Sequence, residues 1–187
     1  NNFSQAKDYL AMTISGYRKL GQLNKNNLNV MMNAMLIAKC FYELEDFDTS
    51  EELYLLVDSA LTDFEKYKKY RILTCNMLGV IASKKNDNEL AWQRFDDAER
   101  LYNEYSDSLN EQETEIIVNI LSSKASLFMY DDPKVSSEIY DELAQYYESE
   151  GKTDAQMYAI CLSNQACCYI LMNNPKKALN VINKAFA

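Results

Sequence analysis

Histidine is absent from the 187-residue chain, and glycine (4), proline (2) and tryptophan (1) are scarce. Without histidine, the commonest general base and metal ligand of proteins is missing. A β-rich fold needs many turns, and so few glycines and prolines do not supply them. We therefore expect an all-α protein that has no metal site, needs no cofactor and is not an enzyme.

Positive charge is also in short supply, because 19 lysines and arginines face 28 acidic residues and leave a net charge of −9. Phosphate contacts need clustered basic residues, so the composition argues against nucleic-acid binding through this segment. No apolar run approaches the ~20 residues of a membrane-spanning helix, and we expect no membrane contact. Because the chain begins at Asn1 without a methionine, we expect a fragment of a longer protein.

The five cysteines are an odd number without CxxC spacing, which argues against both a zinc site and a disulfide framework. Each falls in an apolar helical pattern, where a cysteine acts as a small hydrophobic residue. Unpaired cysteines are typical of a reducing compartment, and we expect a cytoplasmic protein. They are Cys40, Cys75, Cys161, Cys167 and Cys168.

Residues 78–98 read as two antiparallel helices joined by a short polar turn. Gly79 and Ala91 let the two backbones approach closely, and Phe95 fills the space beside them. An equivalent small residue, alanine or serine, stands at the start of each second helix. These residues are Ala6, Ser50, Ala91, Ser136 and Ala178, with spacings of 44, 41, 45 and 42 residues. Repetition at nearly constant length predicts a solenoid of helix pairs.

This spacing predicts about nine helices: half a repeat in 1–24, then helix pairs in 25–67, 68–108, 109–150 and 151–187. Lys124 stands where the other repeats have a small residue, so we expect the third complete pair to pack less closely. Asp48 and Glu51 have the form of a capping box, and Asp132 and Asn174 each precede a proline in a helix-cap position.

The small and large residues quoted above resemble those of tetratricopeptide (TPR) repeats, over essentially the whole chain. Ordinary TPR units have 34 residues, and elongated units of ~42 are similar to those of Gram-positive peptide-pheromone sensors and kinesin light chains. The resemblance implies one array of helix pairs, wound as a right-handed superhelix. Its concave groove is lined by the first helix of each pair and holds an extended peptide or a partner helix.

Carrying the family's groove positions onto this chain selects a mostly apolar set with a few polar groups. Asn76, Lys39 and Lys84 would fix a ligand's backbone or a carboxylate. The alternative is that several of these residues only pack against neighbouring helices. The selected residues are Met35, Lys39, Tyr42, Asn76, Val80, Ser83, Lys84, Leu121, Phe128, Ser163, Cys167 and Ile170, with Met32, Glu43, Leu73, Val118, Ala125, Met129, Ile160 and Leu171 on the same faces.

One asparagine also recurs in or near each first helix, as Asn33, Asn76, Asn119 and Asn164. In the peptide-binding relatives, inner-face asparagines hydrogen-bond the ligand backbone, which suits an amide's paired donor and acceptor. Their offsets from the small-residue pattern differ here, so surface or inter-helix contacts are the competing interpretation.

The sequence thus favours a protein- or peptide-binding module, the ligand-sensing or partner-docking part of a larger regulatory protein. A constitutive scaffold that does not switch is the alternative, and a non-catalytic fragment of an enzyme is a remote one. The expected partner is a peptide or protein segment, and self-association through exposed terminal repeats is a further expectation.

Overall fold

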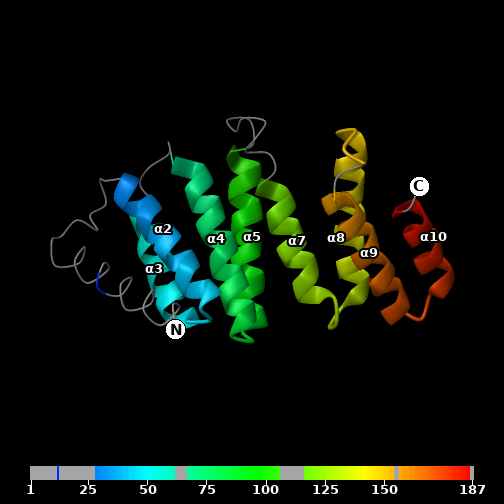
Figure 1. The fold of residues 1–187 in the computed structure, drawn as a ribbon, viewed down its shortest axis with the longest axis horizontal. Helices are drawn as coiled ribbons and strands as arrows, with labels where there is room; N and C mark the ends of the chain where they lie inside the picture. Colours follow the sequence, from blue (N-terminus) through cyan, green and yellow to red (C-terminus); the bar gives the residue numbers. More distant parts are fainter. Residues whose placement is uncertain (1–11, 13–27, 62–66, 106–115, 154–155, 186–187) are drawn as a thin grey trace. The chain divides into compact units, whose positions relative to one another are not determined.

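The computed structural model describes residue 12 and residues 28–61, 67–105, 116–153 and 156–185. In these ranges eight helices and no strand are found (Figure 1). The predicted half repeat in 1–24 lies outside them except for the helical, exposed Met12. The helices are α2 (Leu28–Glu43), α3 (Phe47–Leu61), α4 (Lys68–Lys84), α5 (Asn88–Tyr105), α7 (Ile116–Phe128), α8 (Pro133–Ser149), α9 (Gln156–Leu171) and α10 (Pro175–Ala185).

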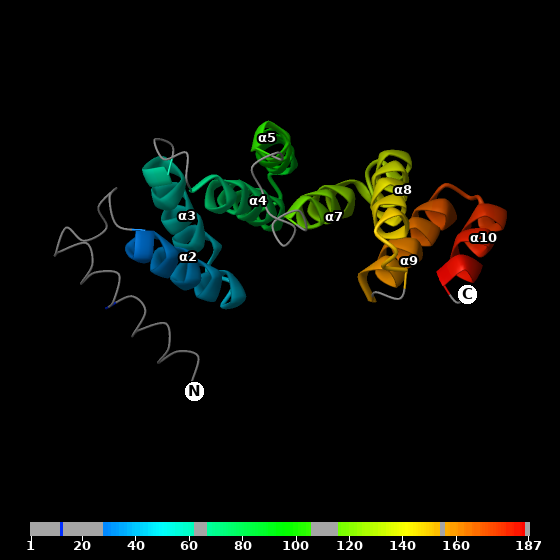
Figure 2. The ribbon, with the colours of Figure 1, turned by 90° about the horizontal axis from the view of Figure 1, so that it is seen from above.

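The chain forms two compact units, Asn1–Ser108 and Leu109–Ala187. In the N-terminal unit, α3 packs against α2 and α4, and α4 packs against α5. In the C-terminal unit, α8 packs against α7 and α9, and α10 packs against α9. The hairpin order can be followed from above in Figure 2. In the described part of the chain, no helix is long and apolar enough to cross a membrane.

Three of the four hairpins have the same turn conformation. A residue with left-handed φ ends the first helix: Glu45 (60°), Asn86 (62°) or Asn173 (55°). The next residue donates its N–H to a carbonyl five residues earlier, at 2.8–2.9 Å, which satisfies a free helix-end carbonyl. Its side-chain oxygen then accepts the N–H three residues later and caps the second helix. The capping residues are Asp46, Asp87 and Asn174.

Asp132 caps α8 in the same way, with its side chain accepting the Val135 N–H at 3.2 Å. The caps expected at Asp132 and Asn174 are therefore present. The capping box expected at Asp48 and Glu51 is wrong, because Asp46 directly precedes α3 and takes the capping position. Asp48 and Glu51 instead each accept a 2.7 Å hydrogen bond from Lys85 Nζ in the α4–α5 turn.

The α7–α8 turn is one residue shorter, since the Asp132 N–H bonds the Phe128 carbonyl four residues back, at 2.8 Å. Ser136 Oγ accordingly donates to the Ala125 carbonyl at 2.8 Å, as Ser50 Oγ donates to the Ala38 carbonyl at 2.7 Å in the first hairpin. Ala125, not Lys124, is thus the small residue of this pair. The placement of Lys124 at the small position is therefore wrong, because the shorter turn shifts α7 by one position, and the looser packing expected for this pair stays a prediction.

Helices α4 and α5 approach each other closely at Gly79. A Cβ placed on Gly79 would lie 2.6 Å from the Phe95 ring, so glycine alone fits. Phe95 (1% exposed), Tyr54 (2%) and Tyr140 (1%) fill the space around the small residues, as their spacing predicted. The positions of the small residues therefore determine which face of each first helix packs against the second helix and which face lies outside the core.

Candidate functional site

The candidate positions lie three before, one after and four after the small residue of each first helix, and they are described helix by helix within each unit. The side chains that pack against the second helix lie on another face of the same helices, so these positions lie at the edge of the core or outside it. The predicted site residues of α2, α4 and α9 occupy this register, except Lys84, which lies five positions after Gly79. Those of α7 do not, because of the shorter α7–α8 turn.

On α2, Lys39 is exposed, and Met35 and Tyr42 are half-buried against the core of the N-terminal unit. Tyr42 also contacts Phe47 across the turn, with ring centroids 5.7 Å apart. Burial, with a smaller contribution from Glu43, raises the pKa of the Tyr42 hydroxyl. This hydroxyl therefore stays protonated near neutral pH and can donate a hydrogen bond.

On α4, Asn76 is only 7% exposed, and its Oδ1 has no hydrogen-bond partner among the residues that the structure describes. Val80 and Ser83 are half-buried, and Lys84 is exposed at the end of the helix. A buried amide oxygen without a donor costs about 1–3 kcal/mol. This face of α4 thus carries an unsatisfied acceptor at Asn76, half-buried Val80 and Ser83 beyond it, and the charge of Lys84 at the end of the helix.

On α7, the one-residue shift places Ser122 and Ser126 at the positions of Asn76 and Val80. Ser122 Oγ is buried without a hydrogen-bond partner in the described ranges, so two first helices have an unsatisfied polar atom at one register position. The predicted Leu121 and Phe128 are half-buried against the core of the C-terminal unit. The sequence alignment of the repeats missed the shift because the turn length is not visible in a small-residue pattern.

On α9, Cys167 is exposed and Ile170 is 63% exposed. Ser163 is half-buried and donates to the Ala159 carbonyl within its own helix, at 2.8 Å. Ile160, one helical turn before Ser163, is 39% exposed. This face is therefore apolar and accessible along most of the helix.

The four recurring asparagines do not share one environment. Asn33 and Asn119 are exposed, Asn76 is buried, and Asn164 is half-buried with its Nδ2 donating to Tyr140 Oη at 3.1 Å. Their different offsets from the small residues explain the difference. Among them, Asn76 alone combines burial with an unsatisfied atom.

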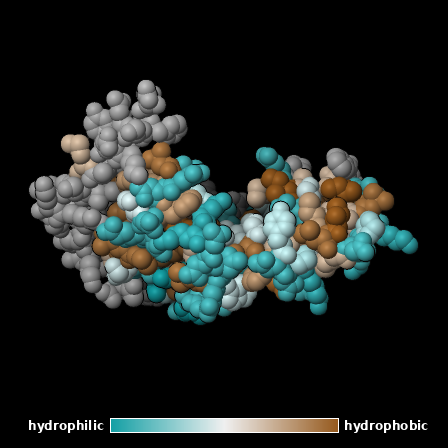
Figure 3. Space-filling model, turned by 90° about the horizontal axis from the view of Figure 1, so that it is seen from below, coloured by the Kyte–Doolittle hydropathy of each residue, from teal (hydrophilic) through white to brown (hydrophobic). Residues whose placement is uncertain are grey.

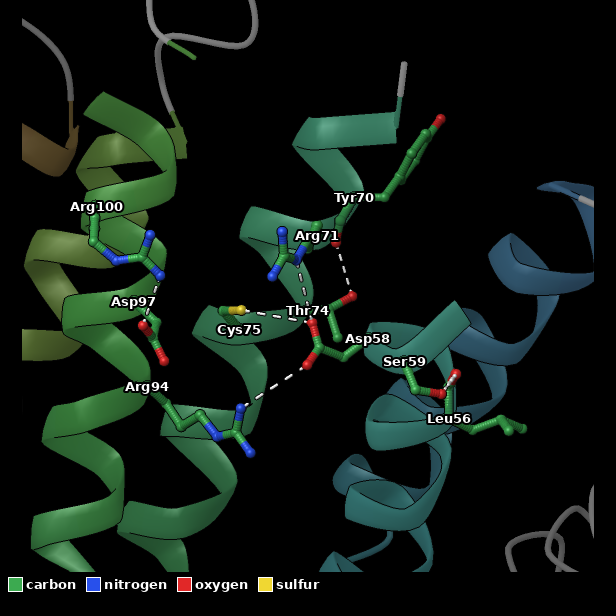
Figure 4. A network of polar contacts seen from close by, with 10 residues as sticks. All are labelled: Leu56, Asp58, Ser59, Tyr70, Arg71, Thr74, Cys75, Arg94, Asp97 and Arg100. Atoms are coloured by element: carbon green, nitrogen blue, oxygen red, sulfur yellow. Dashed lines mark hydrogen bonds and ion pairs between the residues drawn. The ribbon is translucent and has the colours of Figure 1, made fainter. Parts of the chain in front are cut away.

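A polar cluster that we did not predict joins α3, α4 and α5 (Figure 4). Asp58 forms ion pairs with Arg71 (Nε–Oδ1, 3.8 Å) and Arg94 (Nη1–Oδ2, 3.9 Å), and all three side chains are less than 30% exposed. Arg100 pairs with Asp97 on α5 at 3.0 Å. No short motif could reveal this cluster, because its members come from three helices.

Cys75 lies within that cluster, with its Sγ 3.9 Å from Asp58 Oδ1. Burial and the Asp58 charge raise the pKa of this thiol to about 12, although two arginines act in the opposite direction. The thiol is therefore protonated and poorly nucleophilic near neutral pH.

All five cysteines are free, and Cys75, Cys161 and Cys168 are buried as small hydrophobic residues. Cys40 and Cys167 differ from the expectation of burial, because they lie on exposed faces of α2 and α9. Within the described ranges, no group of three histidine, cysteine, aspartate or glutamate side chains could hold a metal ion.

Four helical hairpins with a recurring turn define an all-α protein of the helical-repeat class. Among solved structures, the chain is similar to the crystal structure of BtubC (BKLC) from P. vanneervenii. The TM-score is 0.74 at 13% identity, over 97% of this chain and 73% of that one. No protein-family model matches the chain, and no curated protein matches it. At this identity the likeness shows the fold alone, and it confirms the predicted all-α fold.

Proposed function

We propose that this chain is a TPR module that binds a peptide or a partner helix in a concave groove lined by its first helices, as the ligand-sensing or docking part of a larger regulatory protein. The supporting observations are the helical-repeat fold and the register that leaves one face of each first helix outside the core. The proposal includes no catalytic step.

The observation that carries the proposal is the buried, unsatisfied Oδ1 of Asn76. A peptide backbone offers N–H donors at regular intervals, and one of them would satisfy this oxygen once the Asn76 amide turns toward the surface. Half-buried Val80 would contact an apolar side chain of the same ligand, and exposed Lys84 would pair with a carboxylate. The cost of the unsatisfied atom in the free protein is then recovered on binding.

A peptide-library screen against the purified chain, followed by fluorescence anisotropy with the best binder, tests this role. We expect Asn76→Leu to weaken binding about tenfold, which corresponds to ~1.4 kcal/mol. The same substitution removes the unsatisfied buried atom, so we expect the free protein to keep or gain stability. A loss of affinity together with unchanged or higher stability separates a binding role from a folding role.

Asn33→Leu is the matched control, because Asn33 is an exposed asparagine of another first helix. Met35→Glu tests the apolar part of the α2 face. Affinity that is unchanged in both Asn76→Leu and Met35→Glu would remove the groove proposal. A regulatory sensor predicts that small-angle scattering changes on peptide binding, whereas a constitutive scaffold predicts the same curve with and without peptide.

A further inference from the structure

Helix α9 carries no charged residue in its 16 positions, whereas each of the other seven described helices has at least one. This composition is unusual in a chain in which a quarter of the residues are charged. An uncharged helix is expected in the centre of a core, yet one whole side of α9 lies at the surface. The exposed side of α9 therefore needs an explanation other than the packing of its own unit.

Five residues on that side follow the 3-4-3-4 spacing of a coiled-coil seam: Met157, Ile160, Asn164, Cys167 and Leu171. Met157 and Ile160 are each 39% exposed, and Leu171 is 48% exposed. Ile170 (63%) and Leu179 of α10 (59%) add to the exposed apolar surface of this unit. Figure 3 shows hydrophobic side chains gathered at the C-terminal end of the chain. Seam spacing fits another helix rather than an extended strand, whose side chains alternate every two residues.

We propose that the partner on this seam is a second copy of the chain, bound through its own α9 in an antiparallel, two-fold arrangement. Two chains with a charge of −9 repel one another, and contact through the uncharged helix keeps the interface free of like charges. A two-fold interface uses the same patch on both copies, so the patch must be self-complementary. Seam layers that pair Ile160 with Leu171, and Asn164 with Cys167, meet this condition.

The charges at the two ends of α9 support the antiparallel direction. Lys176 and Lys177 follow its C-terminal end, and both are exposed. Glu148 and Glu150 precede its N-terminal end and are also exposed, and within their own unit Glu148 pairs with Lys184 and Glu150 with Lys152 (4.0 Å), so the incoming lysines would share these carboxylates. Antiparallel pairing brings the basic end of one copy to the acidic end of the other at both sides of the interface. Parallel pairing would instead place like charges together.

This inference does not depend on the proposed function, although Cys167 and Ile170 belong to both surfaces. A ligand on α9 would compete with the second copy, so self-association is measured without any peptide. A monomeric chain would leave peptide binding by Asn76 untouched, and a chain that binds no peptide could still self-associate.

Sedimentation equilibrium of the 187-residue chain gives the first test. The seam is short, so we expect a weak dimer with a Kd of about 10 µM. Its mass rises toward twice 21.6 kDa with concentration. Leu171→Glu places a charge in the seam and should raise the Kd at least tenfold. Leu55→Glu on α3 changes a 41% exposed leucine outside the seam and should leave the Kd unchanged.

A monomer at concentrations about twenty times the expected Kd would overturn the proposal and indicate that another molecule covers the seam. A dimer that Leu171→Glu does not weaken would also overturn it, because the contact would then lie elsewhere.

Cysteine cross-linking tests the direction and register. In a background with Cys40→Ser and Cys167→Ser, which removes the exposed thiols, the double variant Ile160→Cys and Leu171→Cys should form a covalent dimer on mild oxidation. Each single variant should stay monomeric under denaturing conditions, since each new thiol then faces an aliphatic side chain. A covalent dimer that forms as readily from either single variant as from the double variant would contradict the antiparallel arrangement.

Discussion

The hydroxyl of Ser136 donates a 2.8 Å hydrogen bond to the main-chain carbonyl of Ala125, eleven residues earlier. The corresponding contact of the first hairpin joins Ser50 to Ala38 across twelve residues, at 2.7 Å. The difference of one residue is the length of the turn between α7 and α8. It decides which side chains of α7 face the core and which occupy the candidate positions.

The register of α7 can be tested with two neighbouring leucine substitutions. Ala125 is fully buried against α8, so Ala125→Leu should overpack the contact and lower the free energy of unfolding by about 1–3 kcal/mol. Ser126 is exposed, and Ser126→Leu should cost less than about 1 kcal/mol, the value of its hydroxyl contact with Tyr140. Urea denaturation measures both. A larger cost at Ser126 than at Ala125 would contradict the register.

The α4–α5 contact predicts that alanine destabilises the protein at Gly79, although alanine is the better helix former by ~1 kcal/mol. The added Cβ would lie 2.6 Å from the ring of Phe95, which is buried and has little room to move. We expect Gly79→Ala to lower the free energy of unfolding by about 1–3 kcal/mol.

A double-mutant cycle isolates this clash. In a Phe95→Leu background the ring is gone, so Gly79→Ala should become neutral or stabilising when unfolding is followed by circular dichroism. An equal cost of Gly79→Ala in both backgrounds would show that the ring is not the cause.

Asp58 should be worth more to stability than a surface ion pair, because it serves two arginines in a half-buried cluster. Asp58→Asn leaves Arg71 and Arg94 without their counter-charge, and we expect a loss of about 1–3 kcal/mol in urea denaturation. Asp97→Asn is the control, because its pair with Arg100 is largely exposed and should contribute under about 1 kcal/mol. Equal losses for the two variants would show that the cluster stabilises the fold no more than a surface ion pair does.

Thiol chemistry and pH provide a further prediction. Cys75 has a pKa of about 12 when folded and an ordinary value of 9.0, so the folded state holds its proton more tightly than the unfolded state. The free energy of unfolding should therefore fall as the pH rises from about 9 to 12, and Cys75→Ala should make this fall shallower.

At pH 8 an aromatic disulfide reagent should modify Cys40 and Cys167 in the folded protein and leave Cys75 unmodified. Rapid modification of Cys75 would contradict its burial.

Much of the fold could be predicted because it depends on local signals. Asp132 and Asn174 were recognisable caps, and the small residues Gly79 and Ala91 marked a close helix contact from their spacing alone. The cap at Asp46 was missed because a capping-box pattern two residues later was the stronger sequence signal. Only the turn geometry shows which of the two carboxylates meets the free N–H groups of α3.

The candidate site was less predictable, because burial depends on contacts between helices. Asn76 and Asn33 look alike in the sequence, yet one is buried and the other exposed. The cluster around Asp58 depends on side chains from three helices, which no periodicity within one helix can bring together. The shift at Ala125 likewise follows from the length of a turn and not from the residues of α7.

Hydrogen–deuterium exchange of the intact chain, with and without the best library peptide, tests the central claim most directly. Binding along the first helices predicts slower exchange in α4 around Asn76, together with one or more of α2, α7 and α9, and loss of that protection in Asn76→Leu. Protection confined to the second helices α3, α5, α8 and α10, or protection that Asn76→Leu leaves unchanged, would contradict it.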